Sequence, residues 1–579
     1  MDRNFFLAVI LSLGVLVLWS QWQDAATQPR ISSNAPSTAE ETEFGDVTHQ
    51  RMASSQELAL GEFPQLEVAR SGPDSSQSSP QIFEPGETIR VETPLYEVEL
   101  TTRGAGIRRW SLKTYREGSR DDRRDMVLTT GEPPFDTAMV TRFAELKRGD
   151  IGSALFRLVT NDGSEVIFDL IRDGVTIRKS FRFDVDSYSF RLRVDIENRS
   201  EETIAPRFGV LWPAHTRDGI DFREQALAVL HAGDIEKELI GGFGKAGFFG
   251  SLSGSPPETE IVFPGEVDWA GFETTYFIAA ILPDQPAEAS ARFVAIEPGK
   301  LAVAEVAFRP VTLTPGQSAT REFRGYVGPK EIDRLTAIGS GMDRSVDLGW
   351  SWIAPMTRFF GWMLRALYSV IPNYGIAIII LTLLVKLVTA PLVTKQMRSM
   401  EGMRGLQPKI KELQAKHADD KQKQSAAMMS LYKKEGVNPL GGCLPMVLQL
   451  PVMIGLFYAL RGSIELREAP FVGWITDLSA PETLFMIPGL GIPIRVLPLV
   501  MGATMVLQQR MTPQPTMDAA QARMMTTMMP IVMTVVFYQF ASGLVLYWLL
   551  SNVLAIAHQL WIRRSLGARP SPSSKQSPK

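Results

Sequence analysis

Apolar and polar residues alternate through the middle of the chain, between about residues 90 and 327. The clearest run, residues 190–197, reads FRLRVDIE, and residues 96–100 show the same pattern earlier. A period of two places one side of a strand in a core and the other side in water. Turn signals such as Asn161-Asp162-Gly163 separate these short runs. The alternation therefore predicts a soluble antiparallel β-sandwich.

Six longer apolar segments are candidate membrane-crossing helices. They are residues 5–22, 374–394, 440–460, 494–508, 524–540 and 543–561. A signal peptide is the alternative for the first segment, but Asp2 precedes it and no A-x-A cleavage site follows. Trp19 and Trp22 are typical of interfacial anchors, which favours an uncleaved first span.

The stretches between these segments differ in composition. Residues 25–87 are rich in Ser, Thr, Pro, Gln and acids, which predicts a disordered tether. A short helix is expected near residues 330–339. Residues 341–372 combine aromatic residues with Arg358 and Arg365, a mixture typical of a helix in the membrane interface. The alternative is that they simply begin the next span.

Basic residues predict the orientation of the chain in the membrane. Residues 395–435 contain ten basic and five acidic residues, and residues 563–579 contain five basic residues and no acid. Both segments are therefore assigned to the cytoplasm, which places the β-sandwich on the far side of the membrane.

The predicted fold class is a polytopic α-helical membrane protein with six transmembrane helices, both termini in the cytoplasm, and a large periplasmic antiparallel β-sandwich domain. The expected parts are the first transmembrane helix (1–24), the tether (25–87), the β-sandwich domain (88–340), an interfacial amphipathic helix (341–372), a five-helix core (373–562) containing a cytoplasmic helical hairpin (395–436), and a basic cytoplasmic tail (563–579).

The cytoplasmic hairpin has recognisable helix boundaries. Pro408 suits the first position of a helix that ends near Lys416, and Asp419-Asp420 favour the start of a second helix. Pro408, Lys409, Lys411 and Lys416 are the candidate docking residues. The alternative is that the charged faces of the hairpin are merely solvated.

Composition excludes several classes of function. The formal net charge of −3 gives no sign of binding to a specific nucleic-acid sequence. The only cysteine, Cys443, cannot form an internal disulfide. The sequence contains no HExxH, CxxC, G-x-S-x-G or phosphate-loop motif. We therefore expect no catalytic residue, no metal and no cofactor.

Lys386 is the main candidate functional residue, because it lies inside the apolar segment 374–394. An ionisable group at that depth is costly unless it faces a polar cavity. The alternative is a side chain that snorkels to the surface. Thr394 lies eight positions later, about 12 Å along a helix, so snorkelling is strained.

Further polar groups accompany Lys386. Thr382 and Thr389 fall on the same helix face as Lys386, although threonines in membrane helices often bond their own backbone. Gln449 and Asn552 supply polar groups on other spans. They either line a cavity or join helices to one another.

Two spans are unusual in length or composition. Between Arg495 and Gln508 lie only twelve uncharged residues, which cover about 18 Å of a hydrocarbon core of roughly 30 Å. Either protein buries the polar ends, or the bilayer is locally thinned. Methionines crowd the segment 524–540, which suits promiscuous apolar contact, with ordinary packing as the alternative.

Four motifs resemble the YidC membrane-protein insertases of Gram-negative bacteria (the YidC/Oxa/Alb family), and the resemblance runs along essentially the whole chain. The motifs are NPLGGCLP at 438–445, continuing to Gln449 and Pro451; SGLVLYW at 542–548, ending in Ser551-Asn552; LQPKIKEL at 406–413; and GYVGPK at 325–330.

The resemblance implies a hydrophilic groove among the last five spans, open to the cytoplasm and to lipid. In the family a single basic residue of the second span, usually arginine, lies in that groove, and Lys386 occupies the matching position. The expected groove residues are Lys386, Thr382, Thr389, Gln449 and Asn552.

The resemblance also implies a function. The chain would insert and fold integral membrane proteins in the bacterial inner membrane, alone or with the Sec translocon. Lys386 would attract acidic residues of a client, while the apolar helix of the client slides along the third and fifth spans. The expected contacts of this slide are Met446, Leu450, Met525, Met529, Met533, Tyr547 and Trp548. Expected partners are nascent and newly made membrane proteins, the Sec translocon and its accessory subunits, the ribosome through the basic tail, and anionic lipid.

Two other classes of function stay open. A secondary transporter with Lys386 in its substrate or ion site predicts paired repeats and broken helices, and the sequence contains no internal repeat. A scaffold whose β-domain binds a periplasmic partner or a sugar would make the β-domain indispensable.

Overall fold

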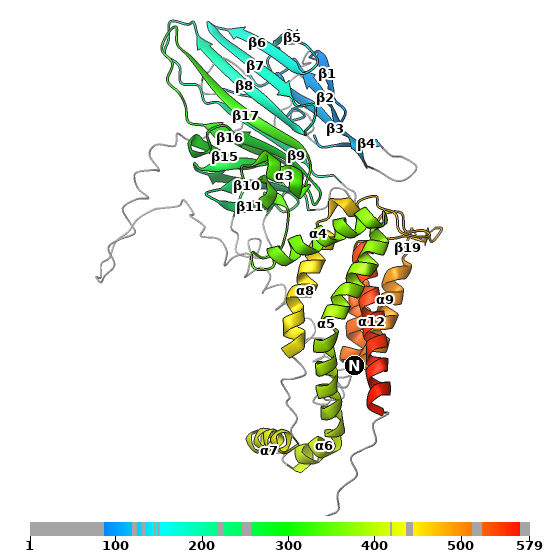
Figure 1. Ribbon diagram of the computed structural model, residues 1–579. Helices are drawn as coiled ribbons and strands as arrows, with labels where there is room; N and C mark the ends of the chain where they lie inside the picture. The colour runs from blue at the N-terminus through cyan, green and yellow to red at the C-terminus, as the bar shows by residue number, and fades with distance from the viewer. Residues whose placement is uncertain are drawn as a thin grey trace, which may run out of the picture. The chain divides into compact units, whose positions relative to one another are not determined.

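The computed structural model describes residues 86–117, 124–129, 135–143, 146, 151–217, 224–245, 256–416, 420–435, 444–489, 491–511 and 524–567. The expected first span, nearly all of the tether, most of the basic tail and residues 438–443 of the NPLGGCLP motif lie outside these residues. In the described part, a strand-rich region precedes a mainly helical region (Figure 1).

The strand-rich region, here called the β-domain, contains three antiparallel sheets. The largest has the strand order β11-β10-β13-β14-β17-β8-β7-β6-β5. Its strands are β5 (Arg157–Asn161), β6 (Glu165–Arg172), β7 (Val175–Phe183), β8 (Ser189–Asn198), β10 (Ala226–His231), β11 (Asp234–Leu239), β13 (Val267–Glu273), β14 (Phe277–Pro283) and β17 (Ser318–Pro329).

Two four-stranded sheets complete the β-domain. One has the order β12-β15-β16-β9 and the other β1-β2-β3-β4. Their strands are β1 (Thr88–Glu92), β2 (Tyr96–Thr101), β3 (Gly106–Glu117), β4 (Arg124–Val127), β9 (Gly209–His215), β12 (Glu260–Phe263), β15 (Ala289–Glu297) and β16 (Leu301–Phe308). A 3-10 turn, η3 (Pro286–Glu288), precedes β15.

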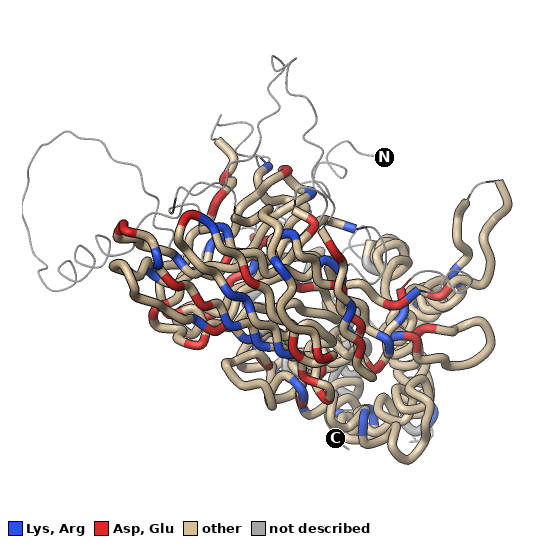
Figure 2. The backbone as a smooth tube through the Cα atoms, turned by 90° about the horizontal axis from the view of Figure 1, so that it is seen from above, with Lys and Arg blue, Asp and Glu red and all other residues tan. Residues whose placement is uncertain are grey.

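The alternating residues of β8 have the two environments that the pattern predicts. Phe190, Leu192, Val194 and Ile196 are buried in the main apolar core of the β-domain, and the residues between them are exposed or half-buried. Figure 2 shows residues of both charge signs interspersed along these strands. This part of the chain is therefore a folded domain with an apolar interior and a charged, solvent-compatible exterior.

The GYVGPK motif has a packing role in this core. β17 pairs with β8 so that Gly325 lies opposite Phe190. A Cβ atom at Gly325 would lie 2.1 Å from the Phe190 ring, and one at Gly328 would lie 2.6 Å from the Tyr188 ring. The two glycines thus leave room for aromatic rings that cross the neighbouring strand.

Helices dominate the chain after β17. They are α3 (Ile332–Ile338), η4 (Met342–Ser345), α4 (Ala354–Val370), α5 (Tyr374–Gly405), α6 (Gln407–Lys416), α7 (Lys421–Lys434), α8 (Leu444–Arg461), η6 (Ile464–Leu466), α9 (Val496–Met511), the π-helical turn η7 (Met524–Met528), α11 (Met529–Phe537) and α12 (Ser542–Gly567). A small hairpin, β18 (Phe485–Met486) and β19 (Pro493–Ile494), precedes α9.

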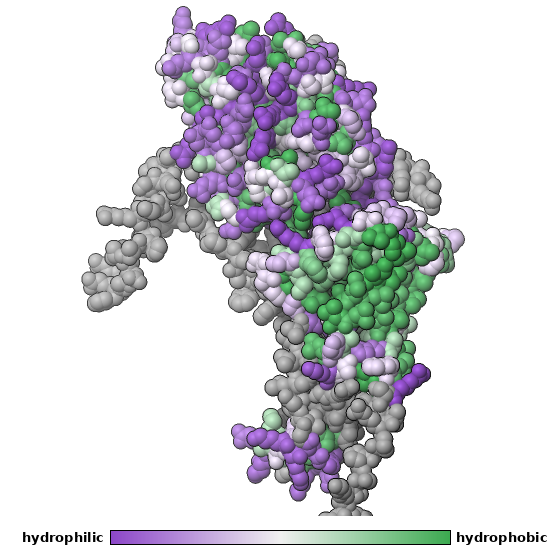
Figure 3. Space-filling view, viewed as in Figure 1, coloured by the Kyte–Doolittle hydropathy of each residue, from purple (hydrophilic) through white to green (hydrophobic). Residues whose placement is uncertain are grey.

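A second apolar cluster joins buried residues of α4, α5, α8, α9, α11 and α12. Two segments of the described helices, Tyr374–Met397 and Ser542–Ile562, are long and apolar enough to cross a membrane. Thr526–Phe537 is a shorter apolar helix. Apolar side chains gather over the visible face of these helices, whereas the β-domain is mostly hydrophilic (Figure 3).

Several helix boundaries differ from the sequence-based expectation. α5 does not end near Thr394; it continues to Gly405 with Pro391 inside it, so it enters the segment assigned to the cytoplasmic hairpin. The expected interfacial helix at 341–372 is a separate 3-10 turn followed by α4. Phe359 and Trp362 on α4 are exposed, whereas Phe360 and Leu364 are buried, so this helix is amphipathic.

The close approach of α9 and α11 depends on Gly502. A Cβ atom at Gly502 would lie 2.0 Å from Thr534 Oγ1 and 3.2 Å from Thr534 Cβ. Thr534 Oγ1 donates a hydrogen bond of 2.7 Å to the Pro530 carbonyl oxygen, which holds the hydroxyl in place. Small residues allow such close contacts between membrane helices.

We therefore expect Gly502→Ala to lower the free energy of unfolding of the full chain in detergent by about 1–3 kcal/mol, the usual cost of overpacking. Gly361→Ala on α4 is the matched control, because the atom nearest to its added Cβ is 3.8 Å away. Thermal unfolding compares the two variants. Adding Thr534→Ala to Gly502→Ala should restore most of the loss, and equal stability of the two glycine variants would contradict the packing explanation.

Candidate functional site

Lys386 lies in the middle of α5 among side chains of different exposure. Its own side chain is half-buried, Thr382 is buried, and Leu387 and Val388 are 69% and 80% exposed. In the part of the chain that the structure describes, no carboxylate forms an ion pair with the Lys386 ammonium. The exposed apolar neighbours suit a lipid-facing surface beside the partly covered lysine.

The apolar helices also carry no acid that could pair with Lys386. The sequence has no Asp or Glu in residues 374–400, 436–464 or 483–517, nor after Asp518. A lone cation in a low-dielectric setting is costly, and an approaching carboxylate would reduce that cost. Lys386 is therefore suited to attract an acidic group from another molecule.

The two threonines of the predicted polar stripe are engaged with their own helix. Thr382 Oγ1 donates to the Ile378 carbonyl oxygen at 2.6 Å, and Thr389 Oγ1 donates to that of Val385 at 2.9 Å. This is the alternative that the sequence left open. These hydroxyls offer acceptor lone pairs to a neighbouring group, but their protons are already used.

His558 on α12 is a polar neighbour of Lys386 that the sequence analysis did not single out. It interacts electrostatically with Lys386, and its Nε2 atom lies 3.0 Å from Thr394 Oγ1 on α5. The contact joins α5 to α12. The available signal was a histidine within an apolar segment, but its partner depends on how two helices cross.

Asn552 and Gln559 join α12 to α9. Asn552 Nδ2 donates to Thr504 Oγ1 at 3.4 Å, and Gln559 Nε2 donates to the Met511 carbonyl oxygen at 2.8 Å. Both side chains are buried. This favours the alternative that they join helices by hydrogen bonds. Gln449 is half-buried on α8.

The residues predicted for the client slide fall into two environments. Leu450 and Met529 are exposed, whereas Tyr547 is buried in the helical cluster, and Met533 and Trp548 pack against it. The side chains of Met446 and Met525 lie outside the described residues. Leu450 and Met529 are thus available at the surface, whereas Tyr547 packs inside the helical cluster.

The hairpin that the sequence assigns to the cytoplasm contains α6 and α7. Asp420 caps α7 by accepting hydrogen bonds from the Gln422 and Lys423 backbone amides at 3.1 and 3.0 Å. Lys409 forms an ion pair of 2.6 Å with Glu435, and Lys416 is exposed. The side chains of Pro408 and Lys411 lie outside the described residues.

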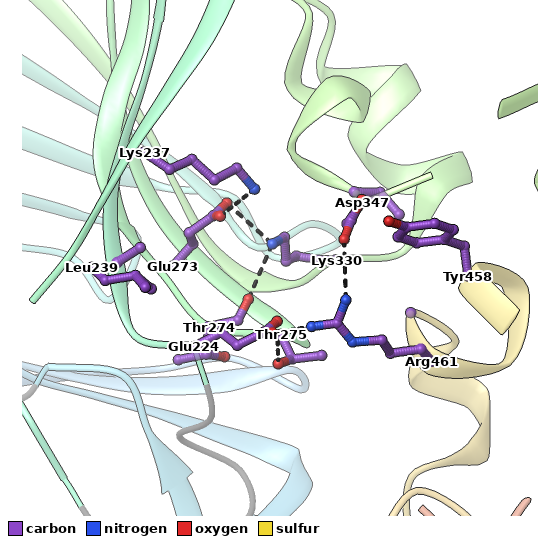
Figure 4. Close-up of a pocket in the computed structure, with 13 residues that line it drawn as sticks. Glu224, Lys237, Leu239, Glu273, Thr274, Thr275, Lys330, Asp347, Tyr458 and Arg461 are labelled. Carbon is purple, nitrogen blue, oxygen red and sulfur yellow. Dashed lines mark hydrogen bonds and ion pairs between the residues drawn. The ribbon is translucent and has the colours of Figure 1, made fainter. Parts of the chain in front are cut away.

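A buried charge cluster lies in the β-domain (Figure 4). Glu273, at the end of β13, is 4% exposed, and its carboxylate pairs with Lys237 at 2.5 Å and Lys330 at 3.1 Å. Burial by itself raises the pKa of Glu273, but the charges of Lys330 and Lys237 outweigh it and hold the pKa below its ordinary value. Lys330 ends the GYVGPK motif and also donates to the Thr274 carbonyl oxygen at 3.0 Å. The cluster therefore fixes the end of β17.

Comparison with known proteins covers almost the whole chain. The family described as 60Kd inner membrane protein matches residues 366–569, and the YidC periplasmic domain matches residues 88–363. The membrane protein insertase YidC of Pelobacter propionicus is 35% identical over 577 residues, which cover 97% of this chain and 99% of that protein. The same-named protein of Citrifermentans bemidjiense is 36% identical over 487 residues, covering 83% of this chain and 86% of that protein. The protein of that name from Methylobacillus flagellatus is 31% identical over 579 residues, covering 97% of each chain. The chain therefore belongs to the YidC family of membrane protein insertases.

Proposed function

We propose that this chain inserts newly made proteins into the bacterial inner membrane through a hydrophilic groove that contains Lys386. The observation that carries this proposal is that, among the described residues, the Lys386 amine has no acidic partner and lies on a helix long and apolar enough to cross a membrane. Thr382, Thr389, Gln449 and Asn552 are proposed as the other polar groups of the groove. His558 joins them because of its interaction with Lys386.

The proposed mechanism needs no covalent step, so it assigns no catalytic residue, metal or cofactor. Lys386 attracts an acidic residue in the hydrophilic part of a client and guides that segment part of the way across the bilayer. The apolar helix of the client then leaves along exposed side chains such as Leu450 and Met529. Burial of that helix in lipid supplies the driving force, with the membrane potential acting on the client's acids.

The topology is also part of the proposal. We propose six spans, with both termini in the cytoplasm and the β-domain in the periplasm. The exposed aromatic side chains of α4 support a position in the membrane interface. The basic tail and the α6–α7 hairpin are proposed to receive the ribosome and the nascent chain. The tail is also proposed to contact anionic lipid. Other clients are proposed to reach this chain from the Sec translocon and its accessory subunits.

Neither alternative function gains support. The relatives that match along the chain are named insertases, and none of those described above is a transporter. The scaffold alternative predicts that the β-domain is indispensable.

Deletion of residues 90–320 tests the proposal against the scaffold alternative. We expect the shortened chain to retain most insertion of a small client into proteoliposomes, because Lys386 and the helices remain. Protease protection of the client measures insertion, and the full chain with Lys386→Glu serves as the comparison. Loss of insertion on deletion, together with full activity of the Lys386→Glu chain, would favour the scaffold.

A further inference from the structure

The loop between α8 and α9 ends in a small, well-formed hairpin. Phe485 pairs with Ile494 and Met486 with Pro493 across β18 and β19. The turn is closed by a hydrogen bond of 2.9 Å from the Ile487 amide to the Ile492 carbonyl oxygen. The pairing of the two strands and this hydrogen bond define the hairpin.

This surface is apolar and uncovered. Leu484, Phe485, Met486 and Ile492 are 43%, 53%, 52% and 47% exposed. The sequence from Thr483 to Ile494 contains no charged residue. In the described part of the chain, none of these four side chains belongs to an apolar cluster. Such a tip would be costly in water because its apolar side chains would be solvated. Exposed apolar surface of this kind marks an interaction site.

The base of the hairpin is anchored to the helices. Glu482 accepts hydrogen bonds from the Leu497 amide at 2.7 Å and from Trp474 Nε1 at 2.5 Å, which ties the first strand to the start of α9. The Arg495 guanidinium lies 5.1 Å from the centre of the Tyr538 ring, and the Tyr538 hydroxyl donates to the Pro493 carbonyl oxygen. The tip therefore cannot fold back freely.

The hairpin lies at the periplasmic end of the helices. The same loop contacts the start of α5, because Asn373 Nδ2 donates to the Phe471 carbonyl oxygen at 3.2 Å. α5 follows the periplasmic β-domain through α4, so its first turn is the periplasmic end. Trp474, Arg495 and Tyr538 at the hairpin base are residue types found where membrane meets water.

The apolar part of α9, the helix that follows the hairpin, is short. Only twelve residues, Val496 to Leu507, separate Arg495 from Gln508; they span about 18 Å of a hydrocarbon core of roughly 30 Å. The side chains of Leu499 and Val500 on α9 are also apolar and exposed. An apolar element at the periplasmic end of α9 would supply the length that this helix lacks.

We propose that the β18–β19 hairpin inserts into the periplasmic leaflet, where lipid acyl chains cover Phe485, Met486 and Ile492. The hairpin adds to the apolar length of α9 at its periplasmic end. The bilayer beside α9 therefore keeps its full hydrocarbon thickness and is not thinned. Acyl chains are the favoured occupant because the segment from Thr483 to Ile494 carries no charge, and because its exposed side chains are apolar. The proposal depends on the membrane orientation and is independent of the insertion activity.

Site-directed spin labelling of the full chain in lipid nanodiscs tests this proposal. The label is placed at Met486→Cys, and in a second variant at Ile492→Cys, with the native Cys443 replaced by serine. Val185→Cys, an exposed apolar position between β7 and β8, is the water-facing control. Accessibility to oxygen, which concentrates in acyl chains, is compared with accessibility to a water-soluble nickel chelate.

We expect both hairpin labels to be accessible to oxygen and strongly protected from nickel, whereas the label at position 185 is accessible to nickel. Nickel accessibility equal to that of position 185 at both hairpin positions would overturn the proposal, because the tip would lie in water. Protection from both reagents would also overturn it, because the hairpin would then be covered by protein.

Discussion

Replacing Lys386 with glutamate is expected to abolish insertion of clients whose translocated segment carries acidic residues. The substitution exchanges an attraction for a repulsion and introduces an acid among apolar segments that contain no Asp or Glu of their own. A change of roughly 1.4 kcal/mol already alters an equilibrium about tenfold, so we expect at least about a tenfold decrease in inserted client. Depletion of the native protein, rescue with the variant and protease protection of the client measure the effect.

Matched variants separate charge from shape at this position. Lys386→Arg should rescue because it keeps the positive charge, and Lys386→Met should fall between the two because it removes the charge only. Lys395→Glu makes the same reversal at an exposed position on the same helix and should have a small effect. Clients without acidic residues should be inserted nearly as well by all variants. Equal rescue of an acidic client by arginine, methionine and glutamate at position 386 would remove the charge argument.

Glu273→Gln is expected to destabilise the β-domain by about 3–5 kcal/mol, the usual cost of removing one partner from a buried ion pair. The substitution leaves Lys330 buried without its acidic partner, with Lys237 nearby. Hydrogen exchange of the β13 amides in the full chain measures the loss at the strand that carries the residue. Glu288→Gln is the control, since Glu288 forms an exposed pair with Arg321, and such a pair contributes about 1 kcal/mol or less.

The same variant gives a pH dependence with a defined sign. The pKa of Glu273 is lower in the folded chain than in the unfolded chain, so its stabilisation is complete above the ordinary carboxyl range. As the pH falls through that range toward the folded-state pKa, the stabilisation decreases. The difference in β13 exchange between the native chain and Glu273→Gln should therefore shrink on acidification. A difference that stays constant with decreasing pH would contradict an ionised Glu273 in the fold.

The sequence predicts local structure well where one short segment contains the whole signal. The alternation at residues 190–197 is sufficient for β8, because side chains on one face of a strand share one environment. Pro408 and Asp420 place the starts of α6 and α7 for a similar reason, since helix caps depend on a few neighbouring residues.

Features that depend on the meeting of distant segments were not predictable. The α5–α12 contact between Thr394 and His558 spans 164 positions, and no local pattern specifies which faces of two helices meet. Tyr547 was predicted to contact clients, but its ring lies within the helical cluster. α5 continues past Thr394 because Pro391 is accommodated inside the helix, whereas the sequence showed only where the apolar run ends.

The presence of one charged side chain, Lys386, in the apolar segment 374–394 also bears on how long a client remains bound. A site that held its cargo with several fixed ion pairs would slow departure, as a channel site that binds too tightly slows conduction. In the proposed groove, the single ammonium of Lys386 would provide one exchangeable contact, which lipid-driven withdrawal of the client would break in one step. Sequence variants that add a second basic side chain near Lys386 should therefore lengthen the dwell time of acidic clients and reduce turnover, even where capture improves.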